Sequence, residues 1–169
     1  MIRFSLIPIV LALAWLGSAG AQMPPVKVES AWTRVTVPGQ KGTGAFMTLT
    51  AAQGLRLVGV QSPVAGIAEI HEMKMEGDVM RMRAIPALEL PAGQPVALRP
   101  GSYHLMLMDL KQPLLKDTQV PVTLRFQDAQ GKPLQVQLSL PVMLAAPTAG
   151  VQGHHGAGHG TGHGAHKGH

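Results

Sequence analysis

Methionine and histidine are the side chains whose spacing suggests chemistry in this sequence, which contains ten methionines, eight histidines and no cysteine. Residues 69–83 carry His71 and Met82, and residues 103–110 carry His104 and Met106. Thioether sulfur is a soft, neutral ligand that suits Cu(I), whereas imidazole also binds Cu(II), zinc and nickel. Ca²⁺ and Mg²⁺ require oxygen ligands, which we expect these strand faces to lack. The set therefore favours binding and transfer of Cu(I) over redox catalysis, because Cu(II) prefers harder ligands.

The first segment predicts a β-hairpin that brings its sulfur atoms together. Alternate residues of a strand share a face, so His71, Met73 and Met75 lie on one side. Gly77-Asp78 suits a two-residue turn with glycine at its first central position. This turn would pair Met73 with Met82 and Met75 with Met80, and it would place His71 diagonally across from Met82, within reach of one metal ion. A register shift of one residue would abolish the arrangement.

The second segment follows the turn formed by residues 99–102. Its alternation places His104, Met106 and Met108 on one face and leaves Leu105 and Leu107 for the core. Two separate segments would thus each present a His-x-Met pair on one strand face.

Packing is the competing explanation for each methionine, because methionine often fills gaps in protein cores. We expect Met75, Met80 and Met108 to be packed side chains, and Met47 and Met143 to belong to the core. For Met73 the sequence favours neither packing nor a role as an additional ligand.

The strands that position the proposed ligands must come from short apolar runs. These runs are rich in Val, Leu, Ile and Thr and are separated by Pro and Gly. The expected strands cover residues 26–35, 44–51, 55–61, 68–75, 79–84, 96–98, 103–109, 120–126 and 134–142. About eight or nine short strands predict an all-β sandwich or barrel. We assign it to a single domain over residues 22–147.

Residues 1–21 have the features of a secretory signal peptide. Arg3 precedes an apolar run from Phe4 to Leu16 that is short for a membrane span, and Ala19-Gly20-Ala21 is a typical cleavage pattern. An uncleaved membrane anchor is the alternative, and lipidation is excluded because the sequence offers no cysteine. We expect export to the periplasm, with no stable membrane insertion after cleavage.

Composition excludes several functional classes. Without cysteine there is no disulfide, thiolate zinc site, iron–sulfur cluster or Cys-ligated blue-copper centre. Two Trp, one Tyr and three Phe are too few for a base-stacking nucleic-acid surface, and the net charge of +5 is scattered. No nucleophile–base pair accompanies the predicted ligands, so we do not expect an enzyme. Glu72 and Asp109 flank the ligands but should point away.

From residue 148 the composition changes to glycine and histidine. Residues 148–169 cannot bury enough apolar surface to offset their ordering entropy, so we expect a disordered tail. Imidazoles alone favour Cu(II), zinc or nickel, which predicts a second, weaker site that collects Cu(II). A purification tag or a merely solubilising tail is the alternative. The tail histidines are His154, His155, His159, His163, His166 and His169.

The predicted ligands follow the pattern H-x10-M-x21-H-x-M, from His71 to Met106. This pattern resembles the signature of the PCuAC family of periplasmic copper chaperones. The phrases AWTR, LPAG, LRPGSYHLMLMDL and VPVTLRF extend the resemblance over residues 26–143. It implies a cupredoxin-like Greek-key β-sandwich that binds one Cu(I) through His71, Met82, His104 and Met106. In many relatives Met follows the first His directly, whereas here Glu72 does and Met73 comes next, so Met73 is a possible additional ligand.

The resemblance also implies partners. It suggests copper delivery to cytochrome c oxidase, at the binuclear centre of subunit II, often alongside a Sco-type copper protein. We expect a monomer. The alternative is a periplasmic copper or zinc buffering or sequestration protein for metal tolerance; a zinc or nickel buffer would bind its metal equally well without Met82 and Met106.

Overall fold

The computed structural model describes residues 24–147, and every regular element in that range is a β-strand. The strands are β1 (Val26–Arg34), β2 (Gly42–Ala51), β3 (Leu55–Gln61), β4 (Ala65–Glu76), β5 (Val79–Ile85), β6 (Leu88–Leu90), β7 (Pro95–Leu98), β8 (His104–Leu110), β9 (Gln119–Asp128) and β10 (Pro133–Met143). Nine of these ten coincide with expected strands. Strand β6 was not expected, because three residues are too few to show an alternation. Within the described range, no helix could cross a membrane.

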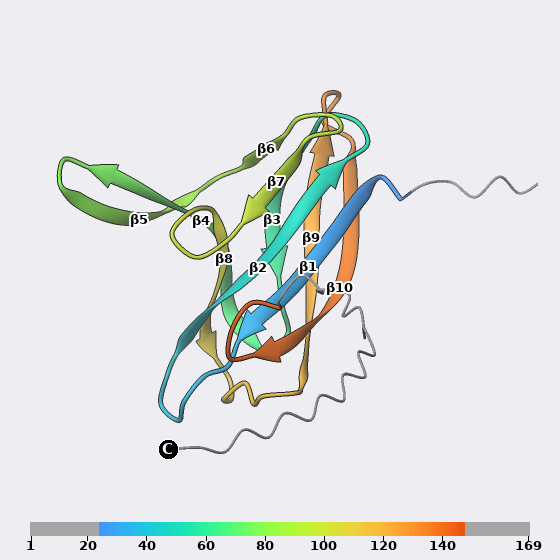
Figure 1. Ribbon diagram of the computed structural model, residues 1–169. Helices are drawn as coiled ribbons and strands as arrows, with labels where there is room; N and C mark the ends of the chain where they lie inside the picture. Colours follow the sequence, from blue (N-terminus) through green and yellow to red (C-terminus); the bar gives the residue numbers. More distant parts are fainter. Residues whose placement is uncertain (1–23, 148–169) are drawn as a thin grey trace, which may run out of the picture.

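The strands form two facing layers joined along one side (Figure 1). One layer has the order β5-β4-β8-β2-β1, with β7 also paired to β2, and the other has the order β10-β9-β3-β6. The parallel pairing of Thr33 in β1 with Val142 in β10 connects the layers. The all-β sandwich expected from the sequence is thereby confirmed. The predicted signal peptide and histidine-rich tail lie outside the described residues.

Alternating apolar side chains fill the space between the layers. Leu105, Leu107 and Leu124 are fully buried, and truncating such a leucine to alanine costs about 2–5 kcal/mol. Met47 also lies in the core, as expected. The prediction that Met143 is a core residue is wrong. It is half-buried because it pairs with the exposed Arg34 at the end of β10, on the side facing away from the layer interior.

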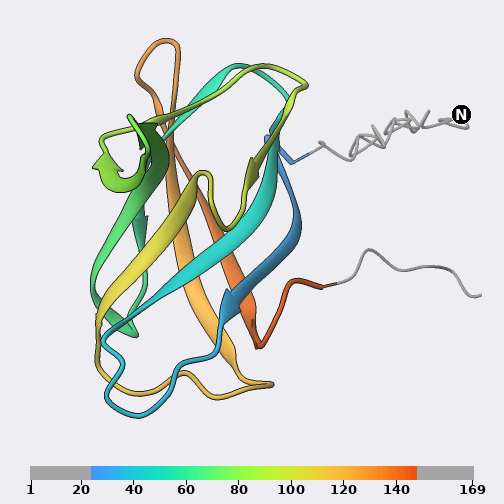
Figure 2. The same cartoon turned by 60° about the vertical axis from the view of Figure 1, so that its left-hand side comes forward.

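The β4–β5 hairpin projects from this sandwich (Figures 1 and 2). The ladder between β4 and β8 ends at His71, because β8 begins at His104. Beyond that point, β5 is the one described strand that pairs with β4, as far as Glu76 opposite Val79. Gly77 has φ of 63°, as a turn with glycine at its first central position requires. The predicted turn and register are both confirmed.

Candidate metal centre

Strand pairing brings the two predicted histidine ligands together although they are distant in sequence. His71 of β4 lies directly opposite His104 of β8, and their ring centroids are 5.7 Å apart. Only 7% of His71 and 6% of His104 is exposed. Both rings lie on the sheet face that points away from Leu105 and Ile70 of the core. The sheet therefore holds two nearly buried imidazoles side by side on its outer face.

Met82, which lies on the projecting hairpin, brings a sulfur atom to the two imidazoles. Its place opposite Met73 is the one predicted from the turn, and its Sδ atom lies 3.2 Å from Nε2 of His104. In contrast to the imidazoles, the Met82 side chain is exposed, with 51% of its surface accessible. The cluster is thus enclosed by the sheet below and reachable from the methionine side.

The Nε2 atom of His104 carries a lone pair directed at this sulfur. Nδ1–H donates to the carbonyl oxygen of Ser102 at 3.0 Å, so Nε2 is the unprotonated nitrogen of the neutral ring. Burial lowers the pKa of His104; the Ser102 hydrogen bond raises it and the nearby His71 lowers it further. Nitrogen and sulfur atoms bound to one ion at about 2.0 and 2.3 Å stand roughly 3–4 Å apart, which matches the observed separation.

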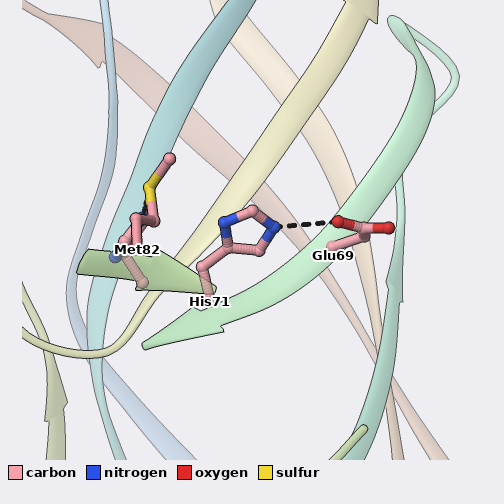
Figure 3. A network of polar contacts seen from close by, with 4 residues as sticks. Glu69, His71 and Met82 are labelled. Atoms are coloured by element: carbon pink, nitrogen blue, oxygen red, sulfur yellow. Dashed lines mark hydrogen bonds and ion pairs between the residues drawn. The ribbon is translucent and has the colours of Figure 1, made fainter. Parts of the chain in front are cut away.

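The two ring nitrogens of His71 also differ in their hydrogen bonding within the described part of the chain. Its Nε2–H donates to Oε2 of Glu69 at 2.8 Å. Among residues 24–147, His71 Nδ1 is the buried side-chain nitrogen or oxygen that lacks a hydrogen-bond partner. Figure 3 shows the His71 ring between Glu69 and Met82, with the second nitrogen on the Met82 side. A carboxylate on one nitrogen of an imidazole orients the other toward a metal.

Glu69 is a residue of this cluster that the sequence analysis missed. It precedes His71 by two residues and so shares its strand face, which makes the expectation of a face without carboxylate oxygens wrong. The alternation that grouped His71 with Met73 was the available signal. Glu72 points away as predicted, toward Arg83 at 2.9 Å.

Met106 lies on the same outer face, one step along β8 from His104. It is half-buried and pairs with Glu69 on one side and Gly44 on the other. Its methyl group comes within 3.7 Å of the position that a Cβ on Gly42 would occupy, so in this conformation the side chain extends away from His104. The structure therefore gathers three of the four predicted ligands and places the fourth next to them.

The burial of the other methionines differs from the prediction. Met75 and Met80 are 53% and 47% exposed, so the expectation that they are packed is wrong, because the hairpin extends beyond the sheet that would cover them. Met73 and Met108 are half-buried. Within residues 24–147, no three His, Cys, Asp or Glu side chains gather in metal-binding geometry.

An aromatic row continues the site across the sheet. The Phe46 ring centroid is 6.4 Å from that of His104 and 4.8 Å from that of Trp32. The Arg34 guanidinium lies 6.0 and 5.9 Å from the Trp32 and Phe46 ring centroids. Gly44 makes room for this row, since a Cβ there would lie 2.6 Å from the Phe46 ring. Phe46 thus lies between His104 and Trp32, the tryptophan of the AWTR phrase.

Comparison with known proteins places the chain in a family. Residues 26–138 match the family model described as "Putative lipoprotein LpqE-like". The chain belongs to the LpqE-like family. The "Putative lipoprotein Lxx21020" of Leifsonia xyli subsp. xyli is 32% identical over 118 residues, which cover 69% of this chain and 71% of that protein.

Solved structures of PCuAC domains share this fold. The apo PCuAC domain from PmoF1 superposes with a TM-score of 0.58 at 25% identity, covering 75% of this chain and 98% of that domain. The solution structure of CuI-DR1885 from Deinococcus radiodurans gives a TM-score of 0.55 at 33% identity, covering 73% and 82%. The resemblance to PCuAC proteins inferred from the sequence is confirmed, and the matched families are not enzyme families.

Proposed function

We propose that this chain is a copper chaperone that binds Cu(I) through His71, Met82, His104 and Met106. One observation carries the proposal: His104 Nε2 faces Met82 Sδ at 3.2 Å, beside the buried Nδ1 of His71, which has no hydrogen-bond partner among residues 24–147. Two imidazole lone pairs and a thioether form a neutral, soft donor set, which suits Cu(I). The similarity to CuI-DR1885, whose name records bound Cu(I), supports the same choice of metal.

The unequal burial of the ligands suits transfer rather than storage. The imidazoles are nearly buried, whereas Met82 is half exposed. An acceptor can therefore displace the sulfur of Met82 first and reach the ion while His71 and His104 still hold it. Thioethers and neutral imidazoles carry no negative charge. Each ligand can therefore release the ion without taking up a proton.

Substitution of Met82 by leucine tests the site. The exchange conserves volume and usually costs less than about 1.5 kcal/mol even in a core, so folding should be retained while Cu(I) affinity falls in a competition titration with a chromogenic Cu(I) chelator. Met143→Leu is the control, because Met143 lies at the end of β10, a strand that carries none of the four proposed ligands. Wild-type Cu(I) affinity in Met82→Leu would overturn the assignment.

We place this activity in the periplasm, after export directed by residues 1–21, and assign delivery to cytochrome c oxidase. The resemblance of the ligand pattern to PCuAC proteins supports the binuclear copper centre of subunit II, or a Sco-type protein, as recipient. Cu(I)-loaded chain mixed with a metal-free soluble domain of subunit II should lose copper to it, as followed by metal analysis after separation. Retention of copper by the chain, together with zinc uptake, would favour the alternative of a buffering protein for metal tolerance.

We further propose that the tail histidines, His154 to His169, form a weaker second site for Cu(II). The composition of the tail supports this proposal, because six imidazoles separated by glycine and alanine can converge on one ion without a preformed pocket. A chain ending at Pro147 should retain Cu(I) binding at His71, Met82, His104 and Met106 and lose Cu(II) uptake in isothermal titration. Unchanged Cu(II) stoichiometry in the shortened chain would exclude the tail site.

A further inference from the structure

The outer part of the β4–β5 hairpin presents an apolar face that no other residue within the range 24–147 covers. Three of the eight exposed large apolar residues in that range lie on this face, at Met75, Met80 and Met82. All three are methionines. An ordinary soluble strand places β-branched or aromatic residues on its apolar face, and an unbranched methionine in such a position contributes little to strand stability. What these side chains add is sulfur.

The strand register places these methionines in a row, here called the methionine ladder, which leads toward the metal centre. Met75 lies opposite Met80 and Met73 lies opposite Met82, and residues paired in this way share one face of the ribbon. Directly opposite side chains have Cβ atoms about 4.5–5.5 Å apart, and diagonal neighbours about 7–8 Å apart, within reach of long side chains. The sulfurs of Met73, Met75 and Met80 can therefore converge on one ion.

The opposite face of the same ribbon is charged and internally paired. Glu72 binds Arg83 at 2.9 Å and Glu76 binds Arg81 at 3.0 Å. These cross-strand ion pairs support the register and supply no soft ligand. One side of the ribbon thus carries these ion pairs together with Val79, and the other side carries the thioethers.

We propose that Met73, Met75 and Met80 form a second site for a soft monovalent cation, Cu(I) or Ag(I), outside the His71–His104 centre. This inference rests on the proposed function, because the ion is the same cargo. Three neutral thioethers in an exposed position bind more weakly than a set containing two buried imidazoles. An ion captured there lies next to Met82, which faces Met73 across the hairpin and contacts His104. The methionine ladder serves as the entry and exit route of the metal centre.

Methyl-selective NMR on the full chain, with ¹³C-labelled methionine methyl groups, distinguishes the two sites. Ag(I) is the probe, because it is soft and monovalent and keeps its oxidation state during the titration. The first equivalents should shift the Met82 methyl resonance. Further additions should shift those of Met73, Met75 and Met80 together. The readout belongs to individual methionines, so Ag(I) bound by tail histidines does not contribute to it.

The double variant Met75→Leu/Met80→Leu provides the decisive comparison. It should lose the second shift, now reported by Met73, and keep the first at Met82, whereas the control Met143→Leu should show both. If Met82 shifts in the wild type while the three hairpin methyl groups stay in place up to saturation, the second site is wrong and the chaperone site stands. If Met82 does not shift at any Ag(I) concentration, the proposed function itself fails.

Discussion

The carboxylate of Glu69 accepts a hydrogen bond from Nε2 of His71 at 2.8 Å, and the two residues share one face of β4. Because an ionised carboxylate can only accept, it fixes the proton of the imidazole on Nε2. The lone pair is thereby assigned to Nδ1, the buried atom that has no partner among residues 24–147. In the proposed copper site, Glu69 is therefore a positioning residue that acts through His71.

Replacing Glu69 by alanine should therefore weaken Cu(I) binding and disturb the His71 tautomer. Loss of a partner that orients a metal-binding imidazole typically costs about 10–100-fold in metal affinity. Long-range ¹H–¹⁵N spectra of the metal-free protein should show a single Nε2–H tautomer for His71 in the wild type and a mixture in Glu69→Ala. Glu72→Ala is the control, since Glu72 is a neighbouring carboxylate on the opposite face, bound to Arg83. A retained single tautomer in Glu69→Ala would contradict this role.

The metal-free protein should lose stability as the pH falls below about 6.5. Burial lowers the pKa of His104 from its ordinary value of 6.5, so in this range the unfolded chain binds a proton that the folded chain does not. The free energy of unfolding then rises with pH between the lowered pKa and about 6.5, and it falls on acidification. Urea denaturation above and below this pH measures the slope. His104→Gln, which does not titrate, should flatten it; an equal slope in both proteins would refute the contribution of His104.

Gly44→Ala should destabilise the fold by crowding the aromatic row. The new Cβ would lie 2.6 Å from the Phe46 ring, which cannot move freely because it packs on Trp32. Overpacking of this kind costs about 1–3 kcal/mol, measurable as a lower free energy of unfolding in urea. Gly54→Ala is the matched control, because no atom lies within 4 Å of a Cβ at Gly54. Equal stabilities of the two variants would show that Phe46 yields without strain.

Local patterns predicted the hairpin correctly because its determinants lie close together in sequence. A glycine that must adopt positive φ and a strict two-residue alternation are sufficient to set the pairing of Met73 with Met82. The same alternation predicted which face of β8 enters the core. Burial of the hairpin could not be predicted in this way, since it depends on where β8 begins. Met75 and Met80 consequently proved exposed rather than packed.

The opposition of His71 and His104 required information from outside the local pattern. These residues meet because β4 pairs with β8 across an intervening stretch that contains β5, β6 and β7. The resemblance to a known ligand spacing predicted that they act together, but not that they stand directly opposite each other. The hydrogen bonds that orient each ring, from Glu69 and from the Ser102 carbonyl, depend on side-chain conformation and became visible only in the structure.

The donors of the proposed metal centre belong to two parts of the fold that differ in stiffness. His71 and His104 are anchored over the packed sandwich, whereas Met82 is carried by a two-stranded ribbon that leaves the sheet near the pairing of Ile70 with Ile85. A ribbon paired on one side only bends at far lower energy than a closed core opens. We therefore expect the residence time of a bound ion to follow the bending of this ribbon, so that even a protein that unfolds slowly releases its metal quickly.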